Sequence, residues 1–140
     1  MIRALIDTDV ILDVLLARPQ FVVAAAAIWS ANENQQFEGY ISAITPVNVY
    51  YLARKAQGAD TARQAVRELL SQWRVCPIDH AVLEQALNSH FTDFEDGVQH
   101  SSAANKLVEY IVTRNGDDYK QAILKVVSPA AFLTLLSSSN

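Results

Sequence analysis

Cysteine is almost absent from this chain of 140 residues, and that scarcity limits where the protein is expected to work. The lone Cys76 has no partner for an internal disulfide, so a reducing cytoplasm is the expected location. No apolar run approaches the length that crosses a bilayer. Aspartates at positions 7, 9 and 13 argue against a signal peptide. The sequence therefore predicts a cytoplasmic protein without a membrane partner.

Motifs for several kinds of chemistry are missing as well. His80, His90 and His100 lack the spacing of metal ligands, and there is no Cys/His zinc pattern. No glycine loop that could cradle a phosphate and no Gly-x-Ser-x-Gly nucleophile turn is present. There is also no internal repeat, linker or shift in composition, so we expect residues 1–140 to form a single domain.

The net charge of −4 argues against a simple nucleic-acid binder, which is normally basic. The acidic residues, however, are unevenly distributed. Seven of the 15 fall in three short clusters: Asp7, Asp9, Asp93, Glu95, Asp96, Asp117 and Asp118. Without them, 8 acidic residues face 11 basic ones, a net charge of +3. If the clusters gather around a divalent cation, the remaining surface tolerates a phosphate backbone, so charge alone leaves the partner open.

Short apolar runs alternate with helical patterns, which is typical of a parallel α/β sheet. Five strands are predicted, at Ile2–Ile6, Gly39–Ala43, Arg74–Ile78, Tyr110–Thr113 and Leu124–Val127. Helices are predicted at Val10–Ala17, Phe21–Asn34, Thr45–Gln57, Asp60–Trp73, Ala81–Asn88, Asp93–Glu109 and Pro129–Leu136. Helix caps are expected at Asp60, Asp79, Asp93 and Ser128.

Polar residues follow three of the predicted strands. Asp7-Thr8-Asp9 follows the first strand, residues 42–45 close the second, and residues 114–118 follow the fourth. With right-handed crossovers these loops share one end of the sheet. In open parallel sheets this is the end at which ligands bind.

The aspartates of the first cluster also have structural interpretations. Asp7 follows an apolar strand, which favours a functional role over ordinary surface placement. Asp9 suits a capping or supporting role. Asp13, one helical turn after Asp9, suits a supporting or merely solvated position.

The remaining candidates are more evenly balanced between structure and function. Asp93 suits helix capping, which would make it a supporting residue. Asp96 lies one turn before His100 on or beside a buried face, so capping and cation binding are equally supported. Asn115 and Asp118 are favoured in turns for backbone reasons, and their place at the shared edge is what indicates function.

Oxygen ligands without sulfur or imidazole suit a hard cation, Mg²⁺ or Mn²⁺. Mg²⁺ keeps several waters and needs only one or two direct carboxylates plus substrate oxygens. An acidic cluster around such an ion can orient and deprotonate a water and hold a phosphate for in-line displacement. The pattern therefore indicates hydrolysis of a phosphodiester.

Four segments together resemble the PIN-domain family. Leu5–Asp13 resembles the opening strand and turn of these domains, and Asp93–Ala104 resembles their central acidic helix. Ile111–Tyr119 resembles their fourth-strand motif, and Val127–Leu133 their closing strand and helix. The order and spacing agree over essentially the whole chain.

The resemblance implies a three-layer α/β/α sandwich with a central parallel five-stranded sheet. It also implies a Mg²⁺- or Mn²⁺-dependent ribonuclease acting on RNA, of the kind found in VapC-type toxins. Such toxins are held inactive by an antitoxin protein and are often homodimers. In this chain the helices of 45–73 are a candidate dimer contact, which the size in solution would test. Asp7, Asp96 and Asp118 match the catalytic acidic ligands, Asn115 matches an Asp-or-Asn metal position, and Thr113 matches a supporting hydroxyl.

One departure from the family pattern concerns position 48. The family places a glutamate early in the helix after the second strand, and this chain has Asn48 there. An amide can orient a water but cannot act as a base, so cation affinity should drop. A branch of PIN-like proteins shares this asparagine, so Asn48 is expected to support the site.

Two other functions fit parts of the pattern. Asp7-Thr8-Asp9 with Gly116-Asp117-Asp118 imitates the haloacid dehalogenase-type phosphatases, in which the first aspartate is the nucleophile. Against this, Val10 replaces the expected glycine, no lysine motif lies between, and Asp96 would have no role. The other alternative is a catalytically weakened PIN-like module that binds RNA or a protein partner, which Asn48 and the acidic charge balance support.

Overall fold

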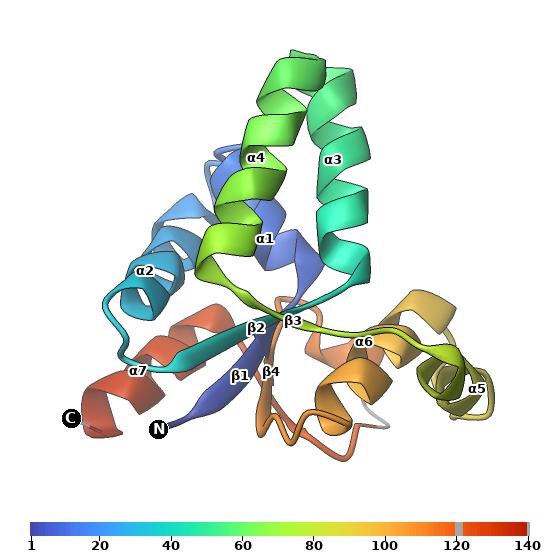
Figure 1. The fold of residues 1–140 in the computed structure, drawn as a ribbon. Helices are drawn as coiled ribbons and strands as arrows, with labels where there is room; N and C mark the ends of the chain where they lie inside the picture. The colour runs from blue at the N-terminus through green and yellow to red at the C-terminus, as the bar shows by residue number, and fades with distance from the viewer. Residues whose placement is uncertain (120–121, 140) are drawn as a thin grey trace.

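A five-stranded parallel sheet lies at the centre of the computed structural model, which describes residues 1–119 and 122–139 (Figure 1). Its strands are β1 (Arg3–Ile6), β2 (Glu38–Ser42), β3 (Arg74–Cys76), β4 (Tyr110–Val112) and β5 (Lys125–Val127). All five predicted strands are present, with ends within two residues of those expected. The predicted parallel sheet is therefore confirmed.

The strand order is β3-β2-β1-β4-β5, with β1 in the middle. The chain moves from β1 outward to β2 and β3, then crosses to β4 and β5 on the other side. The strand order thus reverses between β1 and β4. In open α/β sheets, the carboxyl ends of the strands at such a reversal form the usual binding crevice.

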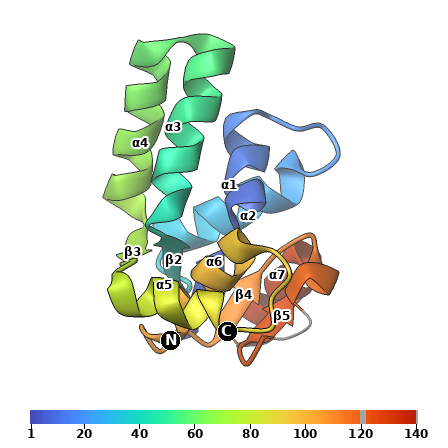
Figure 2. The ribbon, with the colours of Figure 1, turned by 90° about the vertical axis from the view of Figure 1, so that its right-hand side faces the viewer.

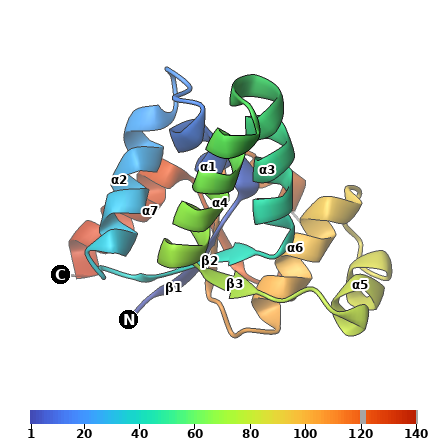
Figure 3. The ribbon, with the colours of Figure 1, turned by 45° about the horizontal axis from the view of Figure 1, so that its top comes forward.

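Helices cover both faces of the sheet and complete a three-layer α/β/α sandwich (Figures 1 and 3). The helices α1 (Thr8–Leu15), α2 (Val22–Glu33) and α7 (Pro129–Ser139) cover one face. On the other face lies α6 (Phe94–Ala104), and α5 (His80–Leu87) packs against the outside of α6. The hairpin of α3 (Ile44–Gln57) and α4 (Ala59–Gln72) projects beyond the sheet (Figure 2).

The alternation of strand side chains explains why both faces are covered. Ala4 and Ile6 of β1 pack into the core beneath α1 and α2, whereas Leu5 packs toward α6. Successive strand residues point to opposite faces, and here both faces are apolar. In the described parts of the chain, no helix is long and apolar enough to span a membrane.

Three of the four predicted helix caps are confirmed. Carboxylate or hydroxyl oxygens of Asp79, Asp93 and Ser128 accept backbone N–H bonds of 2.9, 3.0 and 3.1 Å in the first turns of α5, α6 and α7. The cap expected at Asp60 is wrong, because α4 begins one residue earlier, after Gly58. Asp60 lies in the first turn instead, where its charge favours the helix dipole.

The long helix predicted over Asp93–Glu109 is also wrong, because α6 ends at Ala104. Leu107 adopts a left-handed conformation with φ of 57° and lies exposed. The turn that it makes lets the chain reverse and begin β4 at Tyr110. The helical pattern of residues 105–109 is not realised, because the chain must turn here to enter the inner strand β4.

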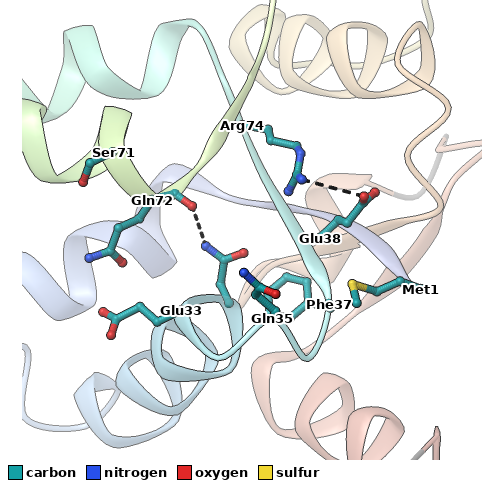
Figure 4. Close-up of a pocket in the computed structure, with 9 residues that line it drawn as sticks. Met1, Glu33, Gln35, Phe37, Glu38, Ser71, Gln72 and Arg74 are labelled. Carbon is teal, nitrogen blue, oxygen red and sulfur yellow. Dashed lines mark hydrogen bonds and ion pairs between the residues drawn. The ribbon is translucent and has the colours of Figure 1, made fainter.

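At the amino end of the sheet, a cavity opens between α2, α4 and β2, lined by residues that include Glu38, Gln72 and Arg74 (Figure 4). The Asn32 amide donates to the Gln72 carbonyl over 2.8 Å and accepts from the Gly39 N–H over 3.0 Å. An added Cβ at Gly39 would lie 2.4 Å from the Trp73 ring and 2.5 Å from the Asn32 amide oxygen. Only glycine fits at this position.

We expect Gly39→Ala to lower the free energy of unfolding by about 1–3 kcal/mol, because the buried Trp73 ring must move to admit the methyl group. Urea denaturation followed by tryptophan fluorescence measures this loss. The control is Gly116→Ala, since an added Cβ there meets no atom within 4 Å. Equal stability of Gly39→Ala and the wild type would contradict the close packing.

Candidate metal centre

A pocket of about 510 Å³ lies at the carboxyl end of the sheet, beside the reversal between β1 and β4. Its walls come from the start of α1, from α3, from the first turns of α6 and from the loop after β4. All but one of the predicted site residues line it: Asp7, Asp9, Asn48, Asp93, Asp96, Asn115 and Asp118. The remaining one, Thr113, is buried and hydrogen-bonded to Asp7. The predicted residues are thus brought together from four parts of the chain.

Asp7 has a buried side chain that hydrogen bonds hold in place. Its residue is 5% exposed, and its carboxylate accepts hydrogen bonds from Thr113 Oγ1 at 2.7 Å and Gln99 Nε2 at 3.3 Å. The side chain makes no capping hydrogen bond to α1, although the Asp7 backbone precedes that helix. Burial raises the pKa of Asp7 and the nearby Asp9 charge adds to the rise, while the Thr113 and Gln99 bonds oppose it.

Gln99 was not predicted as a site residue, and it connects most of the site. Its Nε2 donates to Asp7 and to the Tyr119 hydroxyl at 3.2 Å, and its Oε1 accepts from Thr8 at 3.3 Å. The Thr8 hydroxyl is also 2.8 Å from that of Thr45 at the start of α3. A glutamine three residues after Asp96 lies on the same helical face, and that spacing is the signal by which it could have been found.

Asp96 is half-buried, and its carboxylate accepts a 3.3 Å hydrogen bond from the Tyr119 hydroxyl. Its backbone N–H donates to the Asp93 side chain, so the capping role expected here belongs to Asp93. The pKa of Asp96 is raised to about 7. Burial is the largest cause, and the negative charges of Asp93, Asp7 and Asp118 add to it. Asp96 is therefore crowded by like charges.

The loop after β4 brings two more donors to the pocket. The Asn115 N–H donates to Thr113 Oγ1 at 3.0 Å, and the Asn115 amide lies 3.4 Å from the Asp9 carboxylate. The Asp118 N–H donates to the Asn115 carbonyl at 2.9 Å and begins a 3₁₀ turn, Gly116–Tyr119. Both exposed side chains line the pocket, whereas the neighbouring Asp117 does not.

Asp13 lies away from the pocket wall, and of its two expected positions the structure shows the supporting one and not the solvated one. It is 1% exposed and pairs with Arg114 at 2.8 Å and Arg18 at 3.2 Å. The Arg114 guanidinium also lies over the Phe21 ring, 3.8 Å from its centroid. Because Arg114 immediately precedes Asn115, this partly buried ion pair anchors the loop that carries Asn115 and Asp118.

The donor set suits a hard divalent cation. Carboxylate and amide oxygens predominate, and among the described residues no basic side chain lines the pocket. Within 1–119 and 122–139, no three carboxylates, imidazoles or thiolates are placed so that together they could hold a metal ion. The pocket thus fits an ion held by one or two carboxylates and otherwise by waters, as is usual for Mg²⁺.

The histidines remain outside this chemistry, as the sequence predicts. His100 accepts a hydrogen bond from the Ile123 N–H through Nε2 at 3.0 Å, and its ring contacts Phe91. Burial lowers the pKa of this imidazole, so it is held neutral. None of the three histidines lines the pocket.

Comparison with known proteins agrees with the fold. A sequence profile of the PIN domain family matches residues 3–117. A toxin–antitoxin complex from Klebsiella pneumoniae contains a chain that is 26% identical, with a TM-score of 0.67 and coverage of 90% of this chain and 97% of that one. VapBC2 from Rickettsia felis, bound to a promoter DNA fragment, is 14% identical with a TM-score of 0.70, covering 91% and 98%. A VapC toxin from Mycobacterium tuberculosis described as cleaving the sarcin–ricin loop is 18% identical with a TM-score of 0.67, covering 82% and 92%. Among curated protein sequences no match was found.

We expect Asp96→Asn to raise the melting temperature of the metal-free protein at pH 8 by a few degrees, and by less as the pH falls toward 4. The folded-state pKa of about 7 exceeds the ordinary value of about 4, so the folded state binds the proton more tightly. The wild type therefore loses stability as the pH rises through this interval, and the uncharged variant does not. Thermal denaturation in chelator across this range measures the difference.

The matched control is Asp117→Asn, which removes an exposed carboxylate that does not line the pocket. Its melting temperature should follow the wild type at every pH. An Asp96→Asn profile parallel to that of the wild type would contradict the crowding of like charges.

Proposed function

This chain belongs to the PIN domain family, and from that premise we propose that it is a divalent-metal-dependent ribonuclease that hydrolyses RNA phosphodiesters. The observation that carries the proposal is the acidic pocket at the carboxyl edge of β1 and β4. Asp7, Asp96 and Asp118 line it together, and their mutual repulsion helps raise the pKa of Asp96 to about 7. Such crowding costs stability unless a cation occupies the pocket, so it favours a functional origin.

In this proposal Asp7, Asp96 and Asp118 are the catalytic carboxylates of the site, where one or two of them hold Mg²⁺ or Mn²⁺ directly and the others act through its bound waters, and Asn115 contributes an amide oxygen. When bound, the cation supplies a Lewis acid for the phosphate and a water of lowered pKa. Thr113 and Gln99 hold the Asp7 carboxylate in one orientation, which preorganises it for binding. Asp9 supports the site by accepting a hydrogen bond from the Asn115 amide, and Asp93 supports it by capping α6.

We expect Asp7→Asn and Asp96→Asn each to lower cleavage of structured and single-stranded RNAs by on the order of 100-fold, because each removes a negative charge from the cation site. Chelator should abolish cleavage by the wild type, and added Mg²⁺ or Mn²⁺ should restore it. Gel analysis of end-labelled RNAs measures the rates, with Asp117→Asn as the control.

Two results would contradict this function. Equal cleavage by the wild type and both variants would show that the pocket is not the active site. RNA binding without cleavage in any divalent cation would favour the second candidate, a catalytically weakened binding module, for which the uncharged Asn48 in the pocket wall is the specific observation.

We further propose that this ribonuclease is a toxin of the VapC type with an antitoxin partner, encoded beside it by a short reading frame. Support comes from the Klebsiella complex, a toxin–antitoxin pair whose matching chain is covered over 97% of its length. Expression alone should arrest growth, and co-expression of the neighbouring frame should relieve the arrest and give a complex that co-purifies. Arrest that persists with Asp7→Asn would contradict a toxic nuclease.

The same preparation tests the proposed homodimer. The α3–α4 hairpin exposes several large apolar side chains, namely Val47, Tyr51, Leu52 and Leu70. Burial of such a patch in a second copy is the common solution for a surface of this kind. Light scattering of the purified chain should give twice the mass of 15.5 kDa, and a monomer would contradict the proposal.

A further inference from the structure

A second groove lies on the α3–α4 hairpin and adjoins the acidic pocket at one residue. Its volume is about 420 Å³, and its walls come from the first two turns of α3 and from the middle of α4. Tyr51 lines both this groove and the acidic pocket, and it is 62% exposed. The groove therefore leads away from the pocket along the hairpin that projects beyond the sheet (Figure 2).

The groove combines aromatic rings with cationic side chains. The Tyr50 and Tyr51 rings lie edge to face, with centroids 5.1 Å apart and an interplanar angle of 87°. Arg63 and Arg67 line the groove from α4, one helical turn apart on the same side of that helix. In the described parts of the chain no acidic side chain lines the groove, and neither arginine forms an ion pair. Rings for stacking beside cations for phosphates are the means by which proteins hold single-stranded nucleic acids.

The acidic pocket has no such means of holding a phosphate backbone. None of the described basic side chains lines it. Two arginines near its edge are already engaged, because Arg18 pairs with Asp9 at 3.6 Å and with Asp13, and Arg114 pairs with Asp13. A polyanionic strand that reaches this pocket must therefore be held by cationic groups beside it.

The hairpin carries the positive charge that this requires. Residues 44–72 contain four basic residues (Arg54, Lys55, Arg63 and Arg67) and two acidic ones (Asp60 and Glu68), a net charge of +2. The whole chain has a net charge of −4. The hairpin thus attracts a phosphate backbone although the protein as a whole is acidic.

A second copy of the chain fits this groove less well. In a symmetric contact the same surface of both copies meets, so two grooves packed on each other would gather four arginines without an acid between them. Leu52 and Leu70, which belong to the surface assigned above to the homodimer, do not line the groove. Two copies can therefore meet through these leucines beside it, and the charge of the groove favours a polyanion as its occupant.

We propose that this groove binds a single-stranded segment of the RNA substrate next to the phosphate that is cut, with Arg63 and Arg67 on backbone phosphates and a base stacked on Tyr51. The inference rests on the proposed ribonuclease function and adds to it the path of the strand outside the acidic pocket. Tyr51 is the positioning residue, because it lies where the groove and the pocket meet.

The first test measures RNA binding without cleavage. Fluorescence anisotropy of a labelled oligouridylate of about 12 nucleotides, in chelator and at several salt concentrations, gives the dissociation constant and its salt dependence. The double variant Arg63→Gln/Arg67→Gln should bind about 10-fold more weakly or worse. Its log–log salt slope should fall by about 1.4, because each phosphate contact to a single strand contributes about 0.7.

The matched control is Arg54→Gln/Lys55→Gln, which removes the same charge from the same hairpin outside the groove. Its salt slope should stay close to that of the wild type. An equal loss of slope in both double variants would contradict a defined groove, because the charge of the hairpin as a whole would then hold the RNA.

The second test concerns the ring of Tyr51. Tyr51→Leu should weaken binding roughly 5- to 100-fold, the range for loss of one stacked base, and should leave the salt slope unchanged because stacking involves no ion release. Tyr51→Phe keeps the ring and should restore the affinity. In cleavage assays Tyr51→Leu should raise KM more than it lowers kcat, since the residue holds the strand and takes no part in the chemistry.

The outcomes separate this inference from the proposed function. Cleavage that depends on Asp7, with KM and RNA affinity untouched by every groove variant, would overturn the inference and leave the ribonuclease. RNA held in the groove but cut in no divalent cation would keep the groove and overturn the ribonuclease. If the Arg63→Gln/Arg67→Gln variant lost the dimer or an antitoxin complex while keeping its RNA affinity, the groove would belong to a protein and the inference would fail.

Discussion

The burial of the Asp7 carboxylate is the constraint on which the site depends. A carboxylate that is 5% exposed at the end of a central strand is costly unless hydrogen bonds replace its water. The replacements come from Thr113, at the end of the adjacent β4, and from Gln99, on the helix that covers that face. The reversal of strand order puts the ends of β1 and β4 side by side. The hydrogen bond from Thr113 to the Asp7 carboxylate therefore depends on this topology.

The elements around Asp7 show how a charged pocket is kept in shape. The side chains that support the pocket are paired: Gln99 uses both ends of its amide, and Asp13 forms ion pairs with two arginines. The side chains that face the cavity carry negative charge without basic partners in the pocket, and this repulsion contributes to the raised pKa of Asp96. A hydrogen-bonded support therefore holds an unfavourable cluster of like charges, the arrangement expected where stability is exchanged for binding.

Much of this could be predicted from the sequence, because strand patterns and the polar residues that follow them are local signals. The five strands and the shared edge of Asp7, Asn115 and Asp118 follow from that alternation together with the handedness of crossovers. The end of α6 could not be predicted, because the turn at Leu107 is imposed by the return to a central strand. The spacing of Gln99 from Asp96 places both on one face of α6, but the hydrogen bond from Gln99 to Asp7 and the one from Asn48 to Glu95 could not be predicted, because they join residues 92 and 47 positions apart.

The fold determines at which edge of the sheet the oxygen-bearing side chains meet. It constrains the identity of each of these side chains less. Four parts of the chain line the pocket, namely the start of α1, α3, the first turns of α6 and the loop after β4, so its polar groups do not depend on one element. Asn48 on α3 and Glu95 on α6 face each other across this gap at hydrogen-bonding distance. For a cation that accepts water among its ligands, the total charge and the openness of the pocket matter more than the element that carries each carboxylate. Asn48 therefore adds no charge to the pocket, and its contribution is the hydrogen bond that joins α3 to the first turn of α6.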